Sequence, residues 1–366
     1  MENEEFLTKQ IITYLGNKRS LLDFIGSAVD IVKKELKKDK ITIFDAFSGS
    51  GVVSRLFKQY ADVLYCNDLE GYAKTINTCY LTNAKDIDKK ELEKWYTYLI
   101  DNLTDDKLIS DGFIRRLYSS KDENHIQKDD RVFYTIRNAK YIDTARQLLE
   151  KVPEPYKTLF LGPLLYEAST KNNTGGIFKG FYKNSTTKIG QFGGNGKHAL
   201  NRILANIEIK KPVLSDYNCK VHIFQGDSNK ICKDLPMVDL AYLDPPYNQH
   251  PYSSNYFMLN LINDYKEPKK ISKISGIPIS WNKSSYNKKQ DALNALKMLC
   301  ENLKAKYILI SFNSEGFVSY EDMVHMLEQF GTVRTFEHKY NVFRACRNLK
   351  KRKIHVFEYL FLLEKR

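Results

Sequence analysis

The sequence predicts an α/β protein with a doubly wound, mostly parallel sheet, a long insertion and a C-terminal antiparallel hairpin. Three observations predict this fold class. A strand–turn–helix–strand unit occupies residues 41–68, and its first strand ends in a glycine-rich turn. Strand-like runs return after residue 220, and they follow a charge-rich, helical stretch of roughly 120 residues, the size of a small domain. The last two runs, 332–339 and 354–363, are typical of a hairpin.

Apolar spacing predicts the individual elements in order. A stripe with spacings of three and four residues predicts an amphipathic helix over residues 22–36, with its lysines on the other face. β-Branched and aromatic runs predict the strands. We expect strands at 41–44, 63–66, 221–224, 238–243 and 307–311, and helices at 52–60 and 141–151.

The length of 366 residues exceeds a typical single domain. We therefore expect one α/β domain in two parts, residues 1–84 and 211–366, interrupted by an inserted domain at residues 85–210. The mean hydropathy of -0.47 and the lack of an 18-residue apolar run argue against a membrane span. The acidic N-terminus lacks the basic segment of a signal peptide.

The net charge of +13 and the pI of about 9.2 favour an anionic partner, most commonly nucleic acid, although a merely basic soluble protein is the alternative. The charge is concentrated between residues 171 and 211, where eight basic residues face one acid, Glu208. A second basic run, residues 350–353, is equally typical of a solvated hairpin turn. The six cysteines are scattered without a C-x-x-C pair, which predicts buried thiols in a reducing cytoplasm and no metal site.

The turn at residues 45–51, between a strand and a helix, has the features of a nucleoside-cofactor site. Glycines such as Gly49 and Gly51 let a ligand approach the backbone, and the helix N-terminus offers free N–H groups. Asp68, at the tip of the next strand, is placed to bind the two hydroxyls of a ribose. A plain tight turn and an NAD site are the alternatives.

The segment Asp244, Pro245, Pro246 and Tyr247 follows an apolar strand and carries the most specific signal. Two prolines end the strand and fix the backbone, so the Asp244 carboxylate and the Pro245 carbonyl are displayed at the sheet edge. Two acceptors suit the two N–H donors of an amino group, and the Tyr247 ring offers a face for a base. This set suits an extruded adenine methylated by direct displacement, without a cysteine nucleophile. The alternative is a Pro-Pro turn with a surface aspartate and a packed tyrosine.

Five motifs in order resemble the D12 class of adenine-specific DNA methyltransferases, the Dam-like group with the α order of motifs. They are residues 14–18, 45–51, 67–68, 225–227 and 244–247. The resemblance implies a Rossmann-like methyltransferase fold, S-adenosylmethionine as cofactor, double-stranded DNA as substrate and N6 of adenine as target atom. It also implies a restriction-modification role with a partner endonuclease, or an orphan enzyme, in the cytoplasm. The cofactor-binding residues that it implies are Tyr14, Gly16, Asn17, Lys18, Asp45, Ala46, Phe47, Ser48, Gly49, Gly51, Asp68 and Asp227.

In that family the target-recognition region lies where this chain has its insertion, so we expect the basic stretch there to bind DNA. Lysines and arginines would neutralise phosphates, and asparagines would pair with adenine edges. His250 is interpreted as a pocket or surface residue, since amine methylation needs no base before transfer, and Phe312–Ser314 is a weaker site candidate. The predicted DNA-binding residues are Lys171, Asn172, Asn173, Lys179, Lys183, Lys188, Lys197, Arg202, Tyr252 and Tyr256.

Other functions remain as alternatives. A methyltransferase could act on N4 of cytosine, on adenine in RNA or on a glutamine side chain, but Asp244 and the basic insertion favour adenine in a duplex. A DNA-binding module without catalysis is the alternative from another class, and the intact Asp244 and glycine turn argue against it.

Overall fold

The predicted sheet is confirmed. A computed structural model describes residues 2–246, 249–341 and 355–366, and within them seven strands form one sheet in the order β3-β2-β1-β4-β5-β7-β6. Neighbours among β1 to β5 are parallel, whereas β7 is antiparallel to β5 and to β6. The strands are β1 (Ile41–Asp45), β2 (Ala61–Asp68), β3 (Lys220–Gln225), β4 (Val238–Leu243), β5 (Ala305–Asn313), β6 (Gly331–Asn341) and β7 (His355–Lys365).

The strand order reverses between β1 and β4. From β1 the chain proceeds outward to β2 and β3, and then returns to β4 on the other side of β1. In open α/β sheets a crevice forms at such a switch point, outside the carboxyl ends of the strands, and it is where ligands bind. The fold therefore places a site beyond Asp45 and Leu243, the last residues of these two strands.

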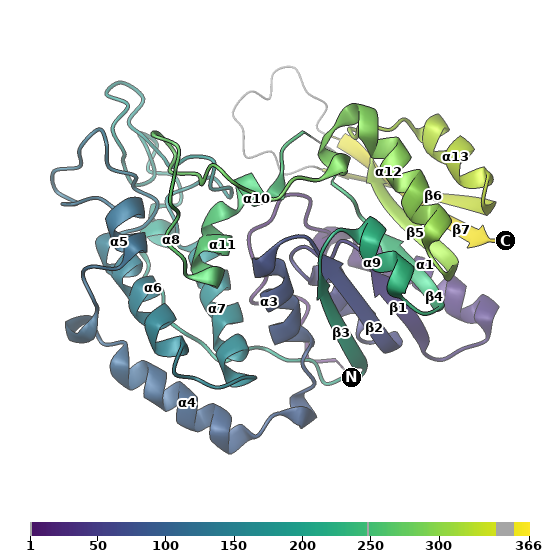
Figure 1. Cartoon of the computed structure of the whole chain (residues 1–366), viewed down its shortest axis with the longest axis horizontal. Helices are drawn as coiled ribbons and strands as arrows, with labels where there is room; N and C mark the ends of the chain where they lie inside the picture. Colours follow the sequence, from purple (N-terminus) through teal and green to yellow (C-terminus); the bar gives the residue numbers. More distant parts are fainter. Residues whose placement is uncertain (1, 247–248, 342–354) are drawn as a thin grey trace.

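Helices cover both faces of the sheet (Figure 1). One apolar cluster joins α1 and α2 to the sheet, and the other joins α9, α12 and α13 to its opposite face. Helix α1 covers the predicted range and ends at Lys37, whose left-handed backbone closes the C-terminus. The helices of this part are η1 (Arg19–Leu21), α1 (Leu22–Leu36), α2 (Val52–Phe57), α9 (Ser228–Asp234), η4 (Ser285–Asn287), α12 (Lys289–Asn302) and α13 (Tyr320–Glu328).

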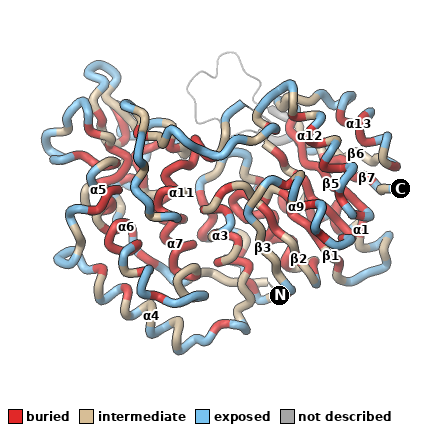
Figure 2. Tube along the Cα trace, in the orientation of Figure 1, coloured by how far each residue is buried: buried red, intermediate tan, exposed pale blue. Residues whose placement is uncertain are grey.

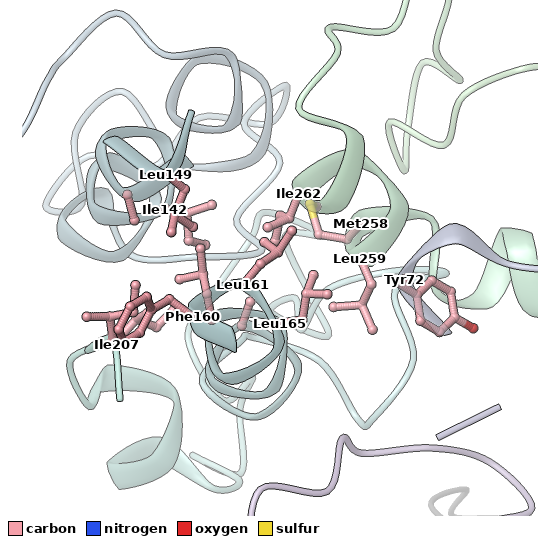
Figure 3. Packing of buried hydrophobic residues seen from close by; sticks show 14 of the residues in the cluster. Tyr72, Ile142, Leu149, Phe160, Leu161, Leu165, Ile207, Met258, Leu259 and Ile262 are labelled. Atoms are coloured by element: carbon pink, nitrogen blue, oxygen red, sulfur yellow. The ribbon is translucent and has the colours of Figure 1, made fainter. Parts of the chain in front are cut away.

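A helical layer lies beside the sheet and has its own core (Figures 1 and 2). The insertion forms most of it, but α3 before the insertion and α11 after it belong to the same apolar cluster. Figure 3 shows Tyr72 of α3 and Leu259 of α11 packed in line with Leu165 of α7. The helices here are α3 (Gly71–Leu81), η2 (Ala84–Asp86), α4 (Lys89–Asn102), η3 (Asp105–Lys107), α5 (Phe113–Tyr118), α6 (Ile136–Leu149), α7 (Tyr156–Thr170), α8 (Leu200–Leu204), α10 (Tyr252–Asn255) and α11 (Phe257–Asp264).

Buried polar groups connect the N-terminal segment to this framework. Arg55 of α2 is buried, and its guanidinium donates to the carbonyls of Phe6, Lys9 and Gln10 at 2.8–2.9 Å while lying 3.9 Å from the Tyr80 ring centroid. These bonds hold the chain that leads to residues 14–18. The five cysteines among the described residues are buried free thiols, as expected, and Cys346 lies outside the described residues.

Candidate functional site

A cavity opens at the switch point of the sheet. The N-terminal segment, the glycine turn after β1, the tip of β2 and the residues after β4 all line it. Asp244 and Gly49 therefore share one cavity, although they are far apart in the sequence. The predicted residues that line it are Tyr14, Gly16, Asn17, Lys18, Asp45, Phe47, Ser48, Gly49, Asp68, Asp227, Asp244, Pro246 and Tyr252.

The glycine turn brings backbone to the cavity wall. Gly49 has φ of +48°, and a Cβ there would lie 3.0 Å from the ring of Tyr14. The Ser48 N–H donates to the Asn67 carbonyl at 2.9 Å, which holds the turn against the tip of β2. A larger residue at position 49 would combine backbone strain with a clash, so the turn requires glycine.

Asp68 is fixed by backbone donors on both sides. Its Oδ2 accepts from the Gly49 N–H at 2.8 Å, and its Oδ1 accepts from the Glu70 N–H at 2.9 Å. Burial raises the pKa of Asp68, while these backbone hydrogen bonds act to lower it. The carboxylate is thus held at the cavity wall with its remaining lone pairs available to hydroxyl donors.

The buried Asn67 joins three strand ends. Its Nδ2 lies 3.0 Å from the Gly226 carbonyl, 3.0 Å from the Ser228 hydroxyl and 3.3 Å from the Ala46 carbonyl. Asp227, beside these groups, caps α9 by accepting from the Asn229 N–H at 3.0 Å. The motif at residues 225–227 is therefore locked to the glycine turn.

Asp244 is paired with Lys18, which the N-terminal segment brings to the end of β4. Lys18 Nζ lies 2.9 Å from Asp244 Oδ1 and 3.3 Å from Glu358 Oε1 of β7. Lys18 and Glu358 are 4% and 1% exposed, so the ammonium group is enclosed between two carboxylates. Burial and the charge of Glu358 raise the pKa of Asp244, the charge of Lys18 lowers it, and together they give a value of about 6. Lys18, which the sequence assigns to the cofactor, is therefore paired with Asp244 and Glu358 in this structure.

Asp45 adds a third carboxylate to the cavity. It accepts from the Ser54 hydroxyl at 2.5 Å and from the Phe47 N–H at 3.4 Å. Burial raises its pKa to about 7, these hydrogen bonds act against that rise, and the charges of Asp244 and Asp68 add to it. The charges of Asp244 and Asp68 therefore disfavour the ionised form of Asp45, and a cation bound beside Asp45 would favour it.

A stack of tyrosines forms the wall next to the glycine turn. The rings of Tyr14, Tyr252 and Tyr256 contact one another with nearly parallel planes, and the centroids of Tyr252 and Tyr256 lie 4.8 and 4.7 Å from that of Tyr14 and 6.0 Å from each other. The Tyr252 hydroxyl donates to the Leu15 carbonyl at 3.0 Å, and the Leu15 N–H donates to the Tyr256 hydroxyl at 2.7 Å. Tyr252 faces the cavity, whereas Tyr256 is fully buried and supports the stack.

Some predicted site residues lie elsewhere. Ala46 is buried behind the turn, where its carbonyl accepts from Ser228 at 2.7 Å, and Gly51 precedes α2 with φ of +77°. Pro245 is absent from the lining of the cavity, and Tyr247 lies outside the described residues.

The basic stretch of the insertion divides into buried and exposed groups. Asn172 and Asn173 are buried, and their amides donate to carbonyls of Ala168 and Val132 at 2.9 Å. Lys171 pairs with Glu167, and Arg202 donates to carbonyls of Thr170 and Thr174, so these four predicted DNA contacts are used within the chain. Of the remaining lysines, Lys188 and Lys197 are exposed, whereas Lys179 and Lys183 are half-buried. Lys179 Nζ lies 3.1 Å from His250 Nδ1.

Several residues of the cavity were not predicted from the sequence. Glu70 is buried, accepts from the amides of Asn260 and Asn282 at 2.5 and 3.4 Å, and has a pKa raised to about 7 by burial. Its position two residues after Asp68 was an available signal. Residues 282–287 also line the cavity, and Tyr286 packs edge-on against Phe47 at 5.1 Å. They lie in η4 and the loop before it, where the sequence has no recognisable motif.

The part of the chain that the structure describes has neither a cluster of metal ligands nor a membrane-spanning helix. No group of three or more His, Cys, Asp or Glu side chains lies close enough to hold a metal ion. No helix in these residues has both the length and the apolar character needed to cross a membrane.

Comparisons with known proteins agree on one family. Residues 14–326 match the D12 class N6 adenine-specific DNA methyltransferase family. The chain is 28% identical to the Type II methyltransferase M.NlaIII of Neisseria lactamica over 97% of its length and 99% of that protein. It is also 28% identical to the Type II methyltransferase M.CviAII of Paramecium bursaria Chlorella virus 1, covering 91% of this chain and 93% of that protein. The modification methylase StsI of Streptococcus sanguinis is 27% identical over 96% of this chain, which spans 52% of that relative.

Proposed function

The chain belongs to the D12 class of N6 adenine-specific DNA methyltransferases, and we propose that it moves a methyl group from S-adenosylmethionine to N6 of an adenine extruded from duplex DNA. The observation that carries this proposal is that Asp244, the glycine turn and Asp68 line a single cavity. The family match does not favour the alternatives of cytosine N4, RNA or a module without catalysis.

The carboxylates and aromatic rings that line the cavity fit S-adenosylmethionine. Asp68, with both oxygens oriented by backbone N–H groups, would hold the ribose hydroxyls, and the Phe47 and Tyr286 rings would enclose the purine. The carboxylates of Asp45 and Asp244 favour a cationic ligand over a neutral one. The bound cofactor supplies a methyl group on a sulfonium centre that attracts nucleophiles.

The residues after β4 would direct the target amine. In our proposal the Asp244 carboxylate accepts one N–H of the adenine, and the carbonyl of Pro245, which adjoins Asp244 but is not itself part of the cavity lining, accepts the other. Two such hydrogen bonds would orient the nitrogen lone pair away from the ring plane and toward the methyl group. The methyl group would bond to N6 as its bond to the sulfonium sulfur breaks, the bonding pair would remain on sulfur, and the proton that N6 loses would pass to solvent water. Lys18 keeps Asp244 ionised and fixes its direction through the 2.9 Å ion pair. Tyr252, at the cavity wall, would support the extruded base, as the sequence predicts for Tyr247.

The insertion, residues 85–210, is proposed as the target-recognition unit of a two-part catalytic domain. The exposed Lys188 and Lys197, with the half-buried Lys179 and Lys183, are available to phosphates. We infer a restriction-modification setting from relatives that carry Type II methyltransferase and modification methylase names, with a cognate endonuclease as partner. The DNA substrate places this activity in the cytoplasm, at the nucleoid.

Purified protein tests the proposal directly. Incubation with radiolabelled S-adenosylmethionine and plasmid DNA should give N6-methyladenine on nucleoside analysis by mass spectrometry. Asp244→Ala should abolish transfer while it leaves cofactor binding largely intact. Asp216→Ala, in an exposed loop before β3, is the matched control and should retain full activity. Undiminished turnover by Asp244→Ala would refute the assigned role.

A further inference from the structure

Residues 266–283, which we term the basic hairpin, carry a cluster of exposed positive charge outside the insertion. The segment has five lysines and one acid, Glu267, whose carboxylate is paired with Arg116 at 2.7 Å. The five lysines are exposed, and within the described part of the chain none of them makes an ion pair. They are Lys266, Lys269, Lys270, Lys273 and Lys283.

The basic hairpin is a formed element. Its two arms meet at the bridge between Ile271 and Pro278, and the Ile279 N–H donates to the Lys270 carbonyl at 3.1 Å. Gly276, in the turn, has φ of +69°, and a Cβ there would lie 2.8 Å from both Arg131 and Tyr118. The turn is therefore packed closely on the helical layer.

Both ends of the basic hairpin are held by the rest of the protein. The Tyr118 hydroxyl donates to the Gly276 carbonyl at 2.8 Å, which attaches the turn to α5. At the other end the Ser253 hydroxyl donates to the Asn282 carbonyl at 2.7 Å, and the Asn282 amide donates to the Leu69 carbonyl at 3.2 Å. Asn282 and Lys283 line the cavity, so the segment extends from the helical layer to the cavity mouth, where Figure 2 shows exposed chain along much of its course.

Large apolar side chains are exposed among these lysines. Ile274 is 72% exposed, Ile279 64% and Trp281 42%. Exposed apolar groups this close together mark an interaction surface, and nucleic acid matches both features because phosphates bind lysines and bases offer apolar faces. Trp281 directly precedes the cavity residues Asn282 and Lys283.

We propose that the basic hairpin is a second DNA-binding element, which holds the duplex over the cavity mouth. Its lysines neutralise phosphates, and Trp281 packs against the bases next to the position from which the adenine is extruded. The inference rests on the proposed function and adds a DNA contact that follows the catalytic segment in sequence and lies outside the insertion.

Salt dependence tests the lysines. Binding of a fluorescein-labelled 24-base-pair duplex of mixed sequence is measured between about 0.05 and 0.3 M salt. For Lys269→Gln/Lys270→Gln/Lys273→Gln, the log–log salt slope should fall by about 2.7, and the affinity at 0.1 M salt should fall by up to about 500-fold. The matched control is Lys85→Gln/Lys89→Gln/Lys90→Gln, in η2 and at the start of α4, which lies on the opposite side of the molecule (Figure 1), and it should behave as the wild type.

Fluorescence tests Trp281 with the hairpin intact. The chain has two tryptophans, so in Trp95→Phe the emission reports Trp281 alone, and the duplex should quench it. Trp281→Ala should lose roughly 5- to 150-fold in affinity with an unchanged salt slope, because the contact is uncharged. An unchanged slope in the lysine variant together with unquenched Trp281 would overturn the inference, and plasmid methylation by the wild type would then still support the proposed function. A wild type that binds DNA through these residues but methylates no DNA would instead overturn the proposed function.

Discussion

Replacing Lys18 with methionine should move the acid limb of the methylation rate toward higher pH. Burial raises the pKa of Asp244, the charge of Lys18, whose Nζ lies 2.9 Å away, lowers it, and the resulting pKa is about 6. An acid is ionised above its pKa, so the acceptor form of Asp244 is present at neutral pH and is lost as the pH falls through about 6. Methionine keeps the length and the packing of the side chain but removes the charge.

The size of the effect follows from the loss of one adjacent cation. Removing such a charge raises a carboxyl pKa by about 1 to 3 pH units, and two unit charges about 4 Å apart at an effective dielectric of 20 give a similar upper value. The pKa of Asp244 in Lys18→Met should then lie between about 7 and 9. At pH 7.5 its ionised share should fall from about 97% to between roughly 75% and 3%, so kcat should fall by up to about 30-fold and recover at higher pH.

Single-turnover methylation from pH 5 to pH 10 measures this shift. Glu358→Gln is the counterpart, because the charge of Glu358 raises the pKa of Asp244 and its removal should move the acid limb to lower pH. Asp45 and Glu70, with pKa values of about 7, also change ionisation in this pH range. The informative quantity is therefore the difference in the midpoint of the acid limb between each variant and the wild type. An S-adenosylmethionine affinity at pH 8.5 equal to that of the wild type shows that each variant is correctly folded. If both variants keep the midpoint of the wild type, Lys18 and Glu358 do not set the ionisation of Asp244.

Three further predictions concern the cofactor site and the framework. Gly49→Ala should weaken S-adenosylmethionine binding by about tenfold or more in calorimetry, because residue 49 has a positive φ and the added Cβ would lie 3.0 Å from the Tyr14 ring. Gly180→Ala, which has open space around it, should bind the cofactor normally. Equal affinities of the two variants would show that the cofactor site does not depend on glycine at position 49. The pKa of Asp45 is about 7, so this carboxyl group becomes ionised as the pH rises from 6 to 8, and the affinity for the sulfonium cation of S-adenosylmethionine should increase. The affinity for S-adenosylhomocysteine, which has no sulfonium charge, should change less. An equal pH dependence for both ligands would show that the carboxylates do not favour the cationic ligand. Arg55→Met should lower the free energy of unfolding, measured in urea, by about 3 kcal/mol, because three buried carbonyls lose their hydrogen-bond donor. The exposed Lys34→Met is the control. A decrease below about 1 kcal/mol for Arg55→Met, similar to that of the control, would show that these hydrogen bonds do not stabilise the fold.

The sheet was predictable because its strands are short apolar runs that end at turn residues. The stripe from Leu22 to Leu36 marked α1 to the residue, since its spacing of three and four fits one helix face. The sequence did not predict that helices before and after the insertion share its apolar core. Tyr72 and Leu259 lie on either side of the insertion in sequence, and only long-range packing shows that they join the core of α7.

The site was predictable where local chemistry marks it. Gly49 and Asp68 stand at strand ends, and Asp244 is followed by two prolines, so their positions follow from the chain itself. The pairing of Lys18 with Asp244 depends on how the N-terminal segment folds across the end of β4, which no local pattern encodes. The same holds for Asn172 and Arg202, whose residue types suggest DNA contacts but whose burial assigns them to carbonyls of the insertion.

Long-read mapping of modified bases in DNA from cells that express the protein tests the central claim most directly. We expect N6-methyladenine within one short sequence context, and its loss when Asp244→Ala replaces the wild type. Methylation of cytosine, or a DNA without any new modified base while the wild-type protein is present and folded, would contradict the account.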